Sequence, residues 1–590
     1  MNPCPTAAET RDLIEAARGK RPCDLALSGG LVVNVFTSEI LRADVGIQGG
    51  RIAAVSANGG IEAAAVIDAG GLILSPGLID AHMHLESTML TPAEFARAAL
   101  PLGTTAVVSD PHEIANVAGA SGIRELMSAC RNLPLTFYFM LPPAVPASEF
   151  ETSGARLDAE DMASLANEPH VLGIAEEMDV AGVLDTREET LSKLGSLPGR
   201  VTDGHAPGLS DRDLQAYAAA GITSDHESTN HWDALEKLRA GMYLMIREGS
   251  AARNLDDLIG LVDPNTERRC LLVTDDLSPA DLVSRGHVDH LLRRAVRRGV
   301  GPVHAIRMVT LNAAERFGLD RVGAIAPGYR ADLVAFEDLS DFRAAFVIAG
   351  GRLVAADGEM AVPLPRHRFS PSLMDSVHIA EIDSGTPAIP DRGGPARVIE
   401  AVDGQIITRE IVMRPASLGG QVRADVERDI LKIVVAERHG RSGNVAVALV
   451  TGFGLKRGAI ASSVAHDSHN VVAVGASDGD IVHAIRHIGE IGGGLVAVAG
   501  ERALADLPLP IAGLISPASA PSVAGRLRRL EHAAHDLGCR MERPFMTLSF
   551  MCLSVVPELK ITDRGLVDVA RGAIVPTFAG EEAVTKLAAG

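Results

Sequence analysis

Cysteine, aromatic residues and positive charge are all scarce in this sequence, and each shortage narrows what the chain can do. Six cysteines are scattered over 590 residues without a C-x-x-C pair, which argues against a disulfide scaffold or a zinc finger and favours a reducing cytoplasm. One tryptophan, four tyrosines and fourteen phenylalanines leave few platforms for stacking bases. The net charge of −20 argues against a nucleic acid or an anionic membrane as partner. We therefore expect a small-molecule ligand or another protein.

Long hydrophobic runs are also missing. No stretch reaches the roughly 18 apolar residues of a membrane span, and the N-terminus lacks the apolar segment of a signal peptide. We expect a soluble cytoplasmic protein. The chain is too long for a single hydrophobic core, so about three domains are expected.

The pattern of apolar runs divides the chain. Short strand-like runs with Gly-Gly turns follow Asp24 and return after Gly328. Between them lie about 250 residues of alternating strand-like and helix-like text, the usual length of a (β/α)8 barrel. We predict an α/β protein in which a β-sandwich is built from both ends of the barrel and an α+β domain follows a linker. The predicted parts are residues 1–75 (N-terminal segment and first part of the sandwich), 76–324 (barrel), 325–365 (second part of the sandwich), 366–396 (linker) and 397–590 (C-terminal domain).

Eight apolar runs in the middle section are candidates for the barrel strands. They are residues 72–80, 105–109, 135–141, 171–176, 201–204, 221–224, 242–246 and 270–274. Polar residues stand at or just beyond the end of most of these runs, where the strands of such a barrel converge on the active-site face. A structural explanation alone would have to treat these strand-end positions as independent coincidences.

Histidine and carboxylate residues at these strand ends predict a metal centre. His82 and His84 are two residues apart on a strand, so both imidazoles point to the same face. Two divalent cations that share a bridging water need several histidine and carboxylate ligands. The predicted ligands are His82, His84, Glu176, His205, His226 and Asp275.

This arrangement resembles the amidohydrolase superfamily. The shared features are D-A-H-M-H at residues 80–84, single histidines after the fifth and sixth strands, an aspartate after the eighth, and G-x-x-A-D-L-V at residues 328–334. In many members that open cyclic amides, the fourth strand supplies a carboxylated lysine. Glu176 stands in that place here, which speaks against those hydrolases.

Longer motifs resemble the adenine deaminases of bacterial type within that superfamily. They are S-D-P-H-E-I-A-N-V at 109–117, G-I-A-E-E-M-D at 173–179, D-G-H-A-P-G-L at 203–209, S-D-H-E-S at 224–228 and, in the C-terminal part, G-F-G-L-K-R-G-A-I-A-S-S-V-A-H-D-S-H-N-V at 452–471. The resemblance spans nearly the whole chain. It implies two divalent metal ions, manganese or iron, although the ligand types also suit zinc, and a homo-oligomer of two or more chains.

The implied reaction is the hydrolysis of adenine to hypoxanthine and ammonia. The metals would supply hydroxide, and Asp275 could accept its proton and return it to nitrogen. The proton for the purine ring has several candidates, among them Glu177 and Glu227, which we assign with Asp275 to catalysis. The residues assigned to substrate binding, or to support of the metal ligands, are Glu86, Asp110, His112, Glu113 and Asn116.

Three alternatives stay open at this point. Another amidohydrolase activity, on a different aminopurine or a cyclic amide, would use the same ligands, and a scaffold on an inactive amidohydrolase fold would keep them without turnover. The C-terminal His466, Asp467 and His469 could bind another metal, reach over the barrel mouth or form a polar turn. The single-zinc nucleobase deaminase fold is excluded, because His84-Leu85-Glu86 has no P-C-x-x-C to accompany it.

Overall fold

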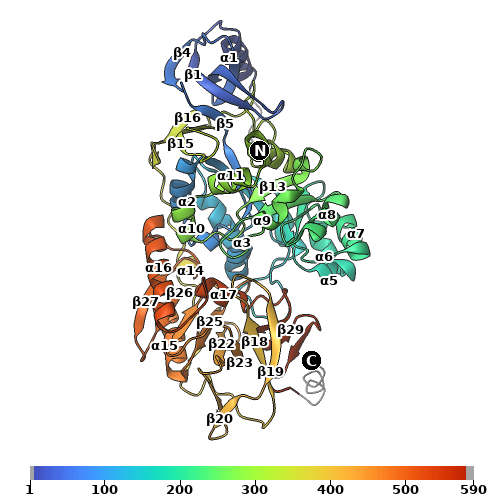
Figure 1. Ribbon diagram of the computed structural model, residues 1–590, viewed down its shortest axis with the longest axis vertical. Helices are drawn as coiled ribbons and strands as arrows, with labels where there is room; N and C mark the ends of the chain where they lie inside the picture. The colour runs from blue at the N-terminus through green and yellow to red at the C-terminus, as the bar shows by residue number, and fades with distance from the viewer. Residues whose placement is uncertain (1–5, 580–590) are drawn as a thin grey trace.

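The computed structural model describes residues 6–579, which form an elongated molecule (Figure 1). A β-sheet lies at one end, a barrel in the middle, and an α+β domain at the other end. No helix in the described range is both long and apolar enough to cross a membrane.

The middle part is a barrel of eight parallel strands. Five strands form one sheet in the order β10-β9-β8-β7-β6, and three form another in the order β11-β12-β13. Backbone hydrogen bonds link the two sheets on both sides, from Asp275 N–H to His82 O (3.1 Å) and from Thr223 N–H to Thr202 O (3.0 Å). The predicted barrel is therefore confirmed. Its strands are β6 Leu78–Met83, β7 Thr104–Ser109, β8 Thr136–Leu141, β9 Val171–Glu177, β10 Val201–Gly204, β11 Ser224–Asp225, β12 Tyr243–Arg247 and β13 Cys270–Val273.

Helices surround the barrel and bury apolar residues against it. Capping side chains set the N-termini of several of them: Asn230 accepts a bond from the Asp233 N–H, and Ser278 accepts one from the Asp281 N–H. The helices are α2 Pro92–Ala99, α3 His112–Ala129, α4 Ala159–Leu165, α5 Val180–Leu184, α6 Glu188–Leu194, α7 Asp211–Ala219, α8 His231–Arg239, α9 Leu255–Leu258, α10 Pro279–Arg285, α11 Val288–Arg297, α12 Pro302–Met308 and α13 Leu311–Arg316.

Strands from before and after the barrel share one nine-stranded sheet. The strand β5 pairs with β1 on one side and with β14 on the other, which joins the two ends of the barrel segment as predicted. Helix α1 Ala7–Ala17 lies against β2 and β3. The strands are β1 Cys23–Asn34, β2 Glu39–Gln48, β3 Arg51–Ser56, β4 Ala63–Asp68, β5 Ile73–Pro76, β14 Leu333–Phe336, β15 Ala344–Ala349, β16 Arg352–Ala356 and β17 Glu359–Met360.

The apolar run at residues 72–80, predicted as a single strand, is two strands in the structure. Gly77 separates β5 of the outer sheet from β6 of the barrel, and its N–H donates to the Asp332 carbonyl (2.9 Å). A Cβ on Gly77 would lie 2.2 Å from Oγ1 of Thr105, so only glycine allows this close approach. The split escaped prediction because both strands are buried and equally apolar.

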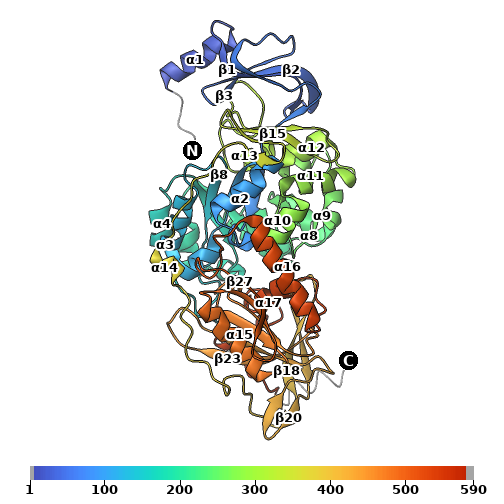
Figure 2. The same cartoon turned by 90° about the vertical axis from the view of Figure 1, so that its left-hand side faces the viewer.

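The C-terminal domain is built on an eight-stranded sheet in the order β19-β18-β23-β22-β25-β24-β26-β27. Helix α15 Asp478–Glu490 packs on this sheet, and α16 Ala520–Asp536 lies against both β27 and the barrel helix α10 (Figure 2). The α+β class is as predicted. The other elements are α14 Pro371–Met374, β18 Ala396–Ala401, β19 Thr408–Met413, β20 Ala416–Leu418, β21 Gln421–Arg423, β22 Leu431–Ala436, β23 Val445–Thr451, β24 Ala459–Ser462, β25 Val471–Gly475, β26 Gly494–Val498, β27 Ala503–Pro508, α17 Pro544–Phe550, β28 Leu559–Thr562, β29 Gly565–Asp568 and β30 Ala573–Val575.

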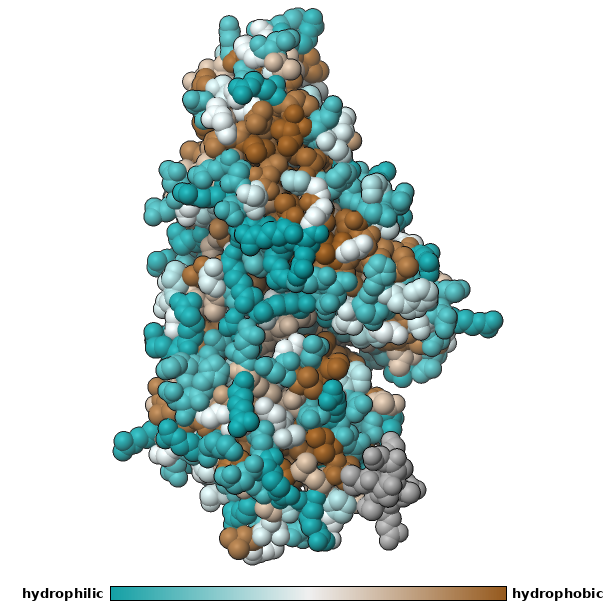
Figure 3. Space-filling view, viewed as in Figure 1, coloured by the Kyte–Doolittle hydropathy of each residue, from teal (hydrophilic) through white to brown (hydrophobic). Residues whose placement is uncertain are grey.

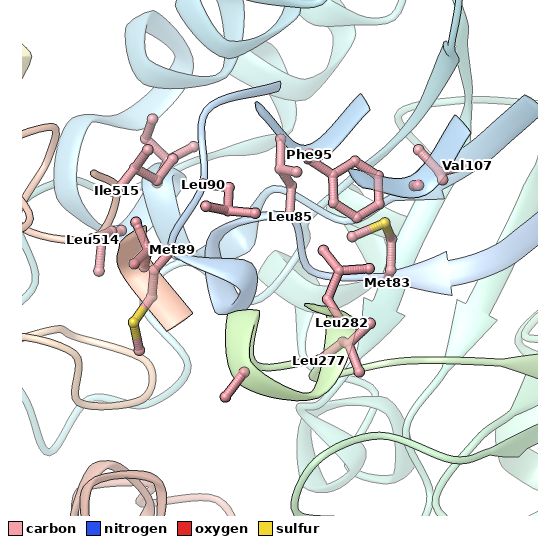
Figure 4. Packing of buried hydrophobic residues seen from close by; sticks show 14 of the residues in the cluster. Met83, Leu85, Met89, Leu90, Phe95, Val107, Leu277, Leu282, Leu514 and Ile515 are labelled. Carbon is pink, nitrogen blue, oxygen red and sulfur yellow. The ribbon is translucent and has the colours of Figure 1, made fainter. Parts of the chain in front are cut away.

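The barrel and the C-terminal domain share apolar packing. Leu514 and Ile515 of the C-terminal domain lie beside Met89 and Leu90, which follow the first barrel strand (Figure 4). The Ser516 N–H donates to the Met89 carbonyl (2.9 Å) at the same place. This contact holds the C-terminal domain over the barrel mouth.

Candidate metal centre and active site

The six predicted metal ligands meet at the end of the barrel that faces the C-terminal domain. Each lies at or just beyond a strand end, and each is buried, with 2–7% of its surface exposed. Because parallel strands end on the same face of a barrel, residues far apart in sequence come together here.

Glu176 occupies the centre of this group. One carboxylate oxygen, Oε1, lies 3.5 Å from Nε2 of His84. The other, Oε2, lies 2.7 Å from Nδ1 of His205 and 3.2 Å from Nε2 of His226. Burial alone would raise the pKa of Glu176, but the histidines outweigh it and hold this pKa well below its usual value. The ionised carboxylate therefore has one oxygen beside His84 and the other beside His205 and His226.

Asp275 faces the histidines of the first strand. Its Oδ1 lies 3.1 Å from Nε2 of His84 and 3.6 Å from Nε2 of His82. Its Oδ2 accepts a hydrogen bond from Nη1 of Arg247 (3.1 Å). The backbone of Asp275 is left-handed (φ 57°), a conformation that aspartate tolerates better than most residues.

Three imidazole nitrogens of the group have no hydrogen-bond partner within the described part of the chain. They are Nε2 of His82, Nε2 of His205 and Nδ1 of His226. A buried polar atom without a partner costs free energy that a bound ligand can recover. Four imidazoles with two carboxylates are a donor set that first-row divalent cations accept. The residues therefore fit a metal centre.

Asp80 and its neighbours support the first pair of ligands. Its carboxylate accepts hydrogen bonds from the hydroxyl (2.5 Å) and backbone N–H (3.2 Å) of Thr274, and it lies 3.1 Å from Nε2 of His287. These contacts tie the middle of β6 to Thr274, the residue that follows β13. Such outer partners fix the orientation of metal-binding side chains.

Asp225 does the same for the second pair of ligands. It accepts hydrogen bonds from the Ala206 N–H, beside His205, and from the Glu227 N–H, beside His226. The fully buried Lys237 donates to it at 2.9 Å. Burial opposes ionisation of Asp225, but Lys237 and its other partners lower its pKa to about 2. The ionised Asp225 thus holds the backbone of the segments that carry His205 and His226.

The predicted substrate-binding residues divide into two groups. His112 and Glu113 line the cavity beside the ligands, and Asp110 holds Nδ1 of His112 at 3.1 Å. Asn116 instead donates to the His112 carbonyl, and Glu86 accepts the Ile114 N–H. These last two residues lie behind the cavity wall rather than in it.

The C-terminal domain forms the opposite wall of the cavity. Its contribution consists of Ile406, His466, Asp467, Phe550 and Leu553. The cavity, of about 40 Å³, shares Glu227, Arg247 and Phe550 with a cleft of about 600 Å³. A second cleft, of about 780 Å³, shares Met178 and His205 with it. Helix α5 and residues just beyond β29 line that second cleft, and Figure 3 shows the molecule hollowed in this region.

Comparison with known proteins agrees with this geometry. The Amidohydrolase family matches residues 73–354, and the Adenine deaminase C-terminal domain family matches residues 405–573. An adenine deaminase 2 of Carboxydothermus hydrogenoformans is 46% identical over 96% of this chain and 99% of its own length. An adenine deaminase of Methanothrix thermoacetophila is 47% identical over 96% of this chain and 99% of its own length. This chain belongs to the adenine deaminase family.

Two carboxyl groups predicted to be catalytic in this deaminase differ in their surroundings. Glu177 accepts the Asp179 N–H at 2.8 Å, and burial raises its pKa to about 7. Glu227 makes a two-pronged ion pair with the guanidinium of Arg247. Burial would raise the pKa of Glu227, but Arg247 outweighs it and lowers that pKa. Glu177 therefore holds a proton more readily than Glu227 does.

Several residues of the deaminase site received no role from the sequence. Arg247 stands at the end of β12, and its two acidic partners, Glu227 and Asp275, lie just beyond other strand ends. Asp80 stands two residues before the ligand His82, and Asp225 stands one residue before the ligand His226. That proximity was the only sign in the sequence that these two aspartates belong to the site. Ile406, Phe550 and Leu553 gave no signal, because apolar residues in a distant domain look like core.

Proposed function

We propose that this protein catalyses the hydrolytic deamination of adenine to hypoxanthine and ammonia. The observation that supports it most strongly is the position of Glu176, whose two carboxylate oxygens face different ligand histidines. A glutamate in this place distinguishes the site from that of the superfamily hydrolases that use a carboxylated lysine. The resemblance to curated adenine deaminases over nearly the full chain supports the same reaction.

Two divalent cations would be held by the six buried ligands. His82, His84 and Asp275 would hold one, His205 and His226 the other, and Glu176 would contact both. Manganese or iron is our first choice, and zinc also suits these donors. When bound, the pair of cations lowers the pKa of water towards neutrality and so provides the nucleophile.

The chain's own residues would move the protons. Asp275 lies among the ligand histidines, where its carboxylate can accept a proton from the attacking water and return it to the departing amino group. Glu177 follows the ligand Glu176 on β9 and lines the cleft that continues from His205. We assign it the proton for the purine ring. Glu227 would keep Arg247 directed at Asp275.

His112 and Glu113 would contact the substrate, while Asp110, Asn116 and Glu86 would position them. Asp110 bonds Nδ1 of His112, and Asn116 bonds its backbone carbonyl. Glu86 anchors the Ile114 N–H, next to Glu113. These three are therefore proposed as positioning residues.

The assembly and location of the protein are part of the proposal. We propose a homo-oligomer, a dimer or larger, in the cytoplasm. Phe36, in the turn between β1 and β2 of the outer sheet, and Ile40 of β2 are 48% and 43% exposed. Figure 3 shows apolar surface gathered where this sheet meets the barrel. Burial of such surface between subunits is favourable.

The decisive experiment measures ammonia release from adenine, adenosine, cytosine and a hydantoin, with metal content determined on the same sample. The protein is prepared with iron chelated and manganese supplied. Release from adenine with about two cations per chain, as expected for a binuclear site, supports the proposal. Two bound cations with ring opening of the hydantoin, and no release from adenine, would replace it with a cyclic-amide activity.

A further inference from the structure

The wall contributed by the C-terminal domain presents two polar side chains to the cavity, His466 and Asp467. Asp467 is 2% exposed, and its Oδ2 has no hydrogen-bond partner among residues 6–579. A buried carboxylate oxygen without a donor is costly unless a ligand supplies one. Asp467 therefore offers a free acceptor oxygen on a wall that it shares with His466 and three apolar side chains.

The neighbours of Asp467 do not compete for this acceptor. Its Oδ1 lies 3.7 Å from Nε2 of His112 and 3.8 Å from Nδ1 of His466, both longer than a hydrogen bond. His466 is instead directed at Glu113, whose Oε1 lies 2.7 Å from its Nδ1. Oδ1 of Asp467 thus lies beside two imidazoles, while Oδ2 keeps no hydrogen-bond partner among residues 6–579.

Adenine carries two kinds of N–H donor, and they lie at opposite ends of the molecule. The amino group on C6 must face the metal ligands, because that carbon is attacked. The ring N–H at N9 then points away from the ligands, towards the wall made by the C-terminal domain. Phe550, Leu553 and Ile406 on that wall can cover the apolar faces of the ring.

We propose that Asp467 accepts the N9–H of adenine and thereby selects the free base over purines substituted at N9, such as nucleosides. This inference rests on the proposed function. A substituent on N9 removes the donor and leaves the buried carboxylate unpaired next to carbon. Sites that hydrogen-bond a substrate N–H reject analogues without it far more strongly than apolar pockets reject a change in size.

The test compares adenine with 9-methyladenine in wild type and in Asp467→Ala. The Michaelis constant for adenine and the competitive inhibition constant of 9-methyladenine give the selectivity, and metal content is measured on each sample. We expect the wild type to favour adenine by about a hundredfold or more, and the variant to lose at least about tenfold of that preference. Bound metal is expected to stay the same.

Asp563→Ala is the matched control. Asp563 is a second buried carboxylate of the C-terminal domain, which accepts the Thr152 N–H at 2.8 Å and does not line the cavity. Its loss is expected to lower stability without changing the preference for adenine. Asp467→Asn keeps the size of the side chain and one acceptor oxygen, so it serves if the alanine variant fails to fold, with a smaller loss of preference.

Each outcome separates this inference from the proposed function. An active wild type whose preference is unchanged in both Asp467 variants would overturn the inference alone. Loss of a bound cation in Asp467→Ala would also overturn it, because His112, Glu113, His466 and Asp467 would then be a cation site. A metal-loaded wild type that releases no ammonia from adenine would overturn the function and this inference together.

Discussion

Two groups of buried histidines face each other where the barrel meets the C-terminal domain, and they use their ring nitrogens differently. In the barrel group, His82, His205 and His226 each leave one nitrogen without a partner inside the described range. In the C-terminal group, His469 uses both: Nδ1 accepts the Ala465 N–H (3.2 Å), and Nε2 is bonded to Glu113.

This difference indicates two roles. Unpartnered nitrogens in the barrel are available to a cation, whereas His469, with its ring nitrogens bonded to Ala465 and Glu113, positions its neighbours. Since Ala465 donates to Nδ1, the proton of His469 is on Nε2, and Glu113 is the acceptor. Glu113 also outweighs the effect of burial on His466 and raises the pKa of that histidine to about 9.

Loss of a barrel histidine is expected to have the largest effect. His226→Ala removes a group that faces Glu176 at 3.2 Å, so we expect loss of bound metal and a fall in turnover of more than about a thousandfold. Metal analysis and ammonia release on the same sample check this. The control is His532→Ala. His532 lies on the exposed side of α16, so this variant is expected to keep its bound metal and its ammonia release. Full metal content in His226→Ala would remove this residue from the ligand set.

Asp275→Asn separates ligand binding from proton transfer at one position. Asparagine keeps an oxygen towards His84 but cannot accept the proton, so we expect retained metal and a loss of about a hundredfold to ten-thousandfold in kcat. Asp276→Asn is the matched control. Asp276 accepts a hydrogen bond from the Ser87 hydroxyl (2.5 Å), and Asp276→Asn is expected to lower kcat less than Asp275→Asn does. Equal losses in the two variants would contradict the assigned proton transfer.

His469→Ala tests the C-terminal group. Without His469, the Glu113 carboxylate loses a donor, and we expect about a tenfold to hundredfold fall in kcat/KM with metal content unchanged. His469→Gln retains a side-chain N–H donor and is expected to recover part of the loss. A fall in bound metal would instead assign His469 to a cation.

Lys560→Met is expected to have the smallest effect on activity. Its effect on the free energy of unfolding is expected to depend on pH. The buried ammonium of Lys560 donates to the carbonyls of Ile406 (2.6 Å) and Phe550 (3.0 Å), two residues of the cavity wall. Burial lowers the pKa of Lys560 to about 7. Between this value and the unfolded value, of about 10.4, the unfolded chain binds more protons, so folding stability contributed by this group rises with pH.

We therefore expect the free energy of unfolding of wild type, relative to Lys560→Met, to rise by up to about 1.4 kcal/mol per pH unit above pH 7. Below pH 7 the difference is expected to be constant. Urea unfolding of both proteins between pH 6 and 9 measures it. A difference that does not change over this range would show that Lys560 keeps its ordinary pKa.

The sequence allowed the barrel and the candidate ligands to be predicted, because strand ends carry a local signature such as D-A-H-M-H. The division at Gly77 was not visible, since two buried strands in different sheets read as one apolar run. The partners of Glu113 were equally hidden. His466 and His469 lie more than 350 residues away, and only the docking of the two domains brings them together.

The burial of the metal ligands has a kinetic consequence. The C-terminal domain covers the mouth of the barrel, and two side clefts formed by the described residues border the cavity. A cation that leaves must pass through the same openings as adenine. The rate at which a chelator strips the protein is therefore expected to depend on access through these clefts as well as on how tightly the ligands hold, and a purine seated in the cavity would slow it.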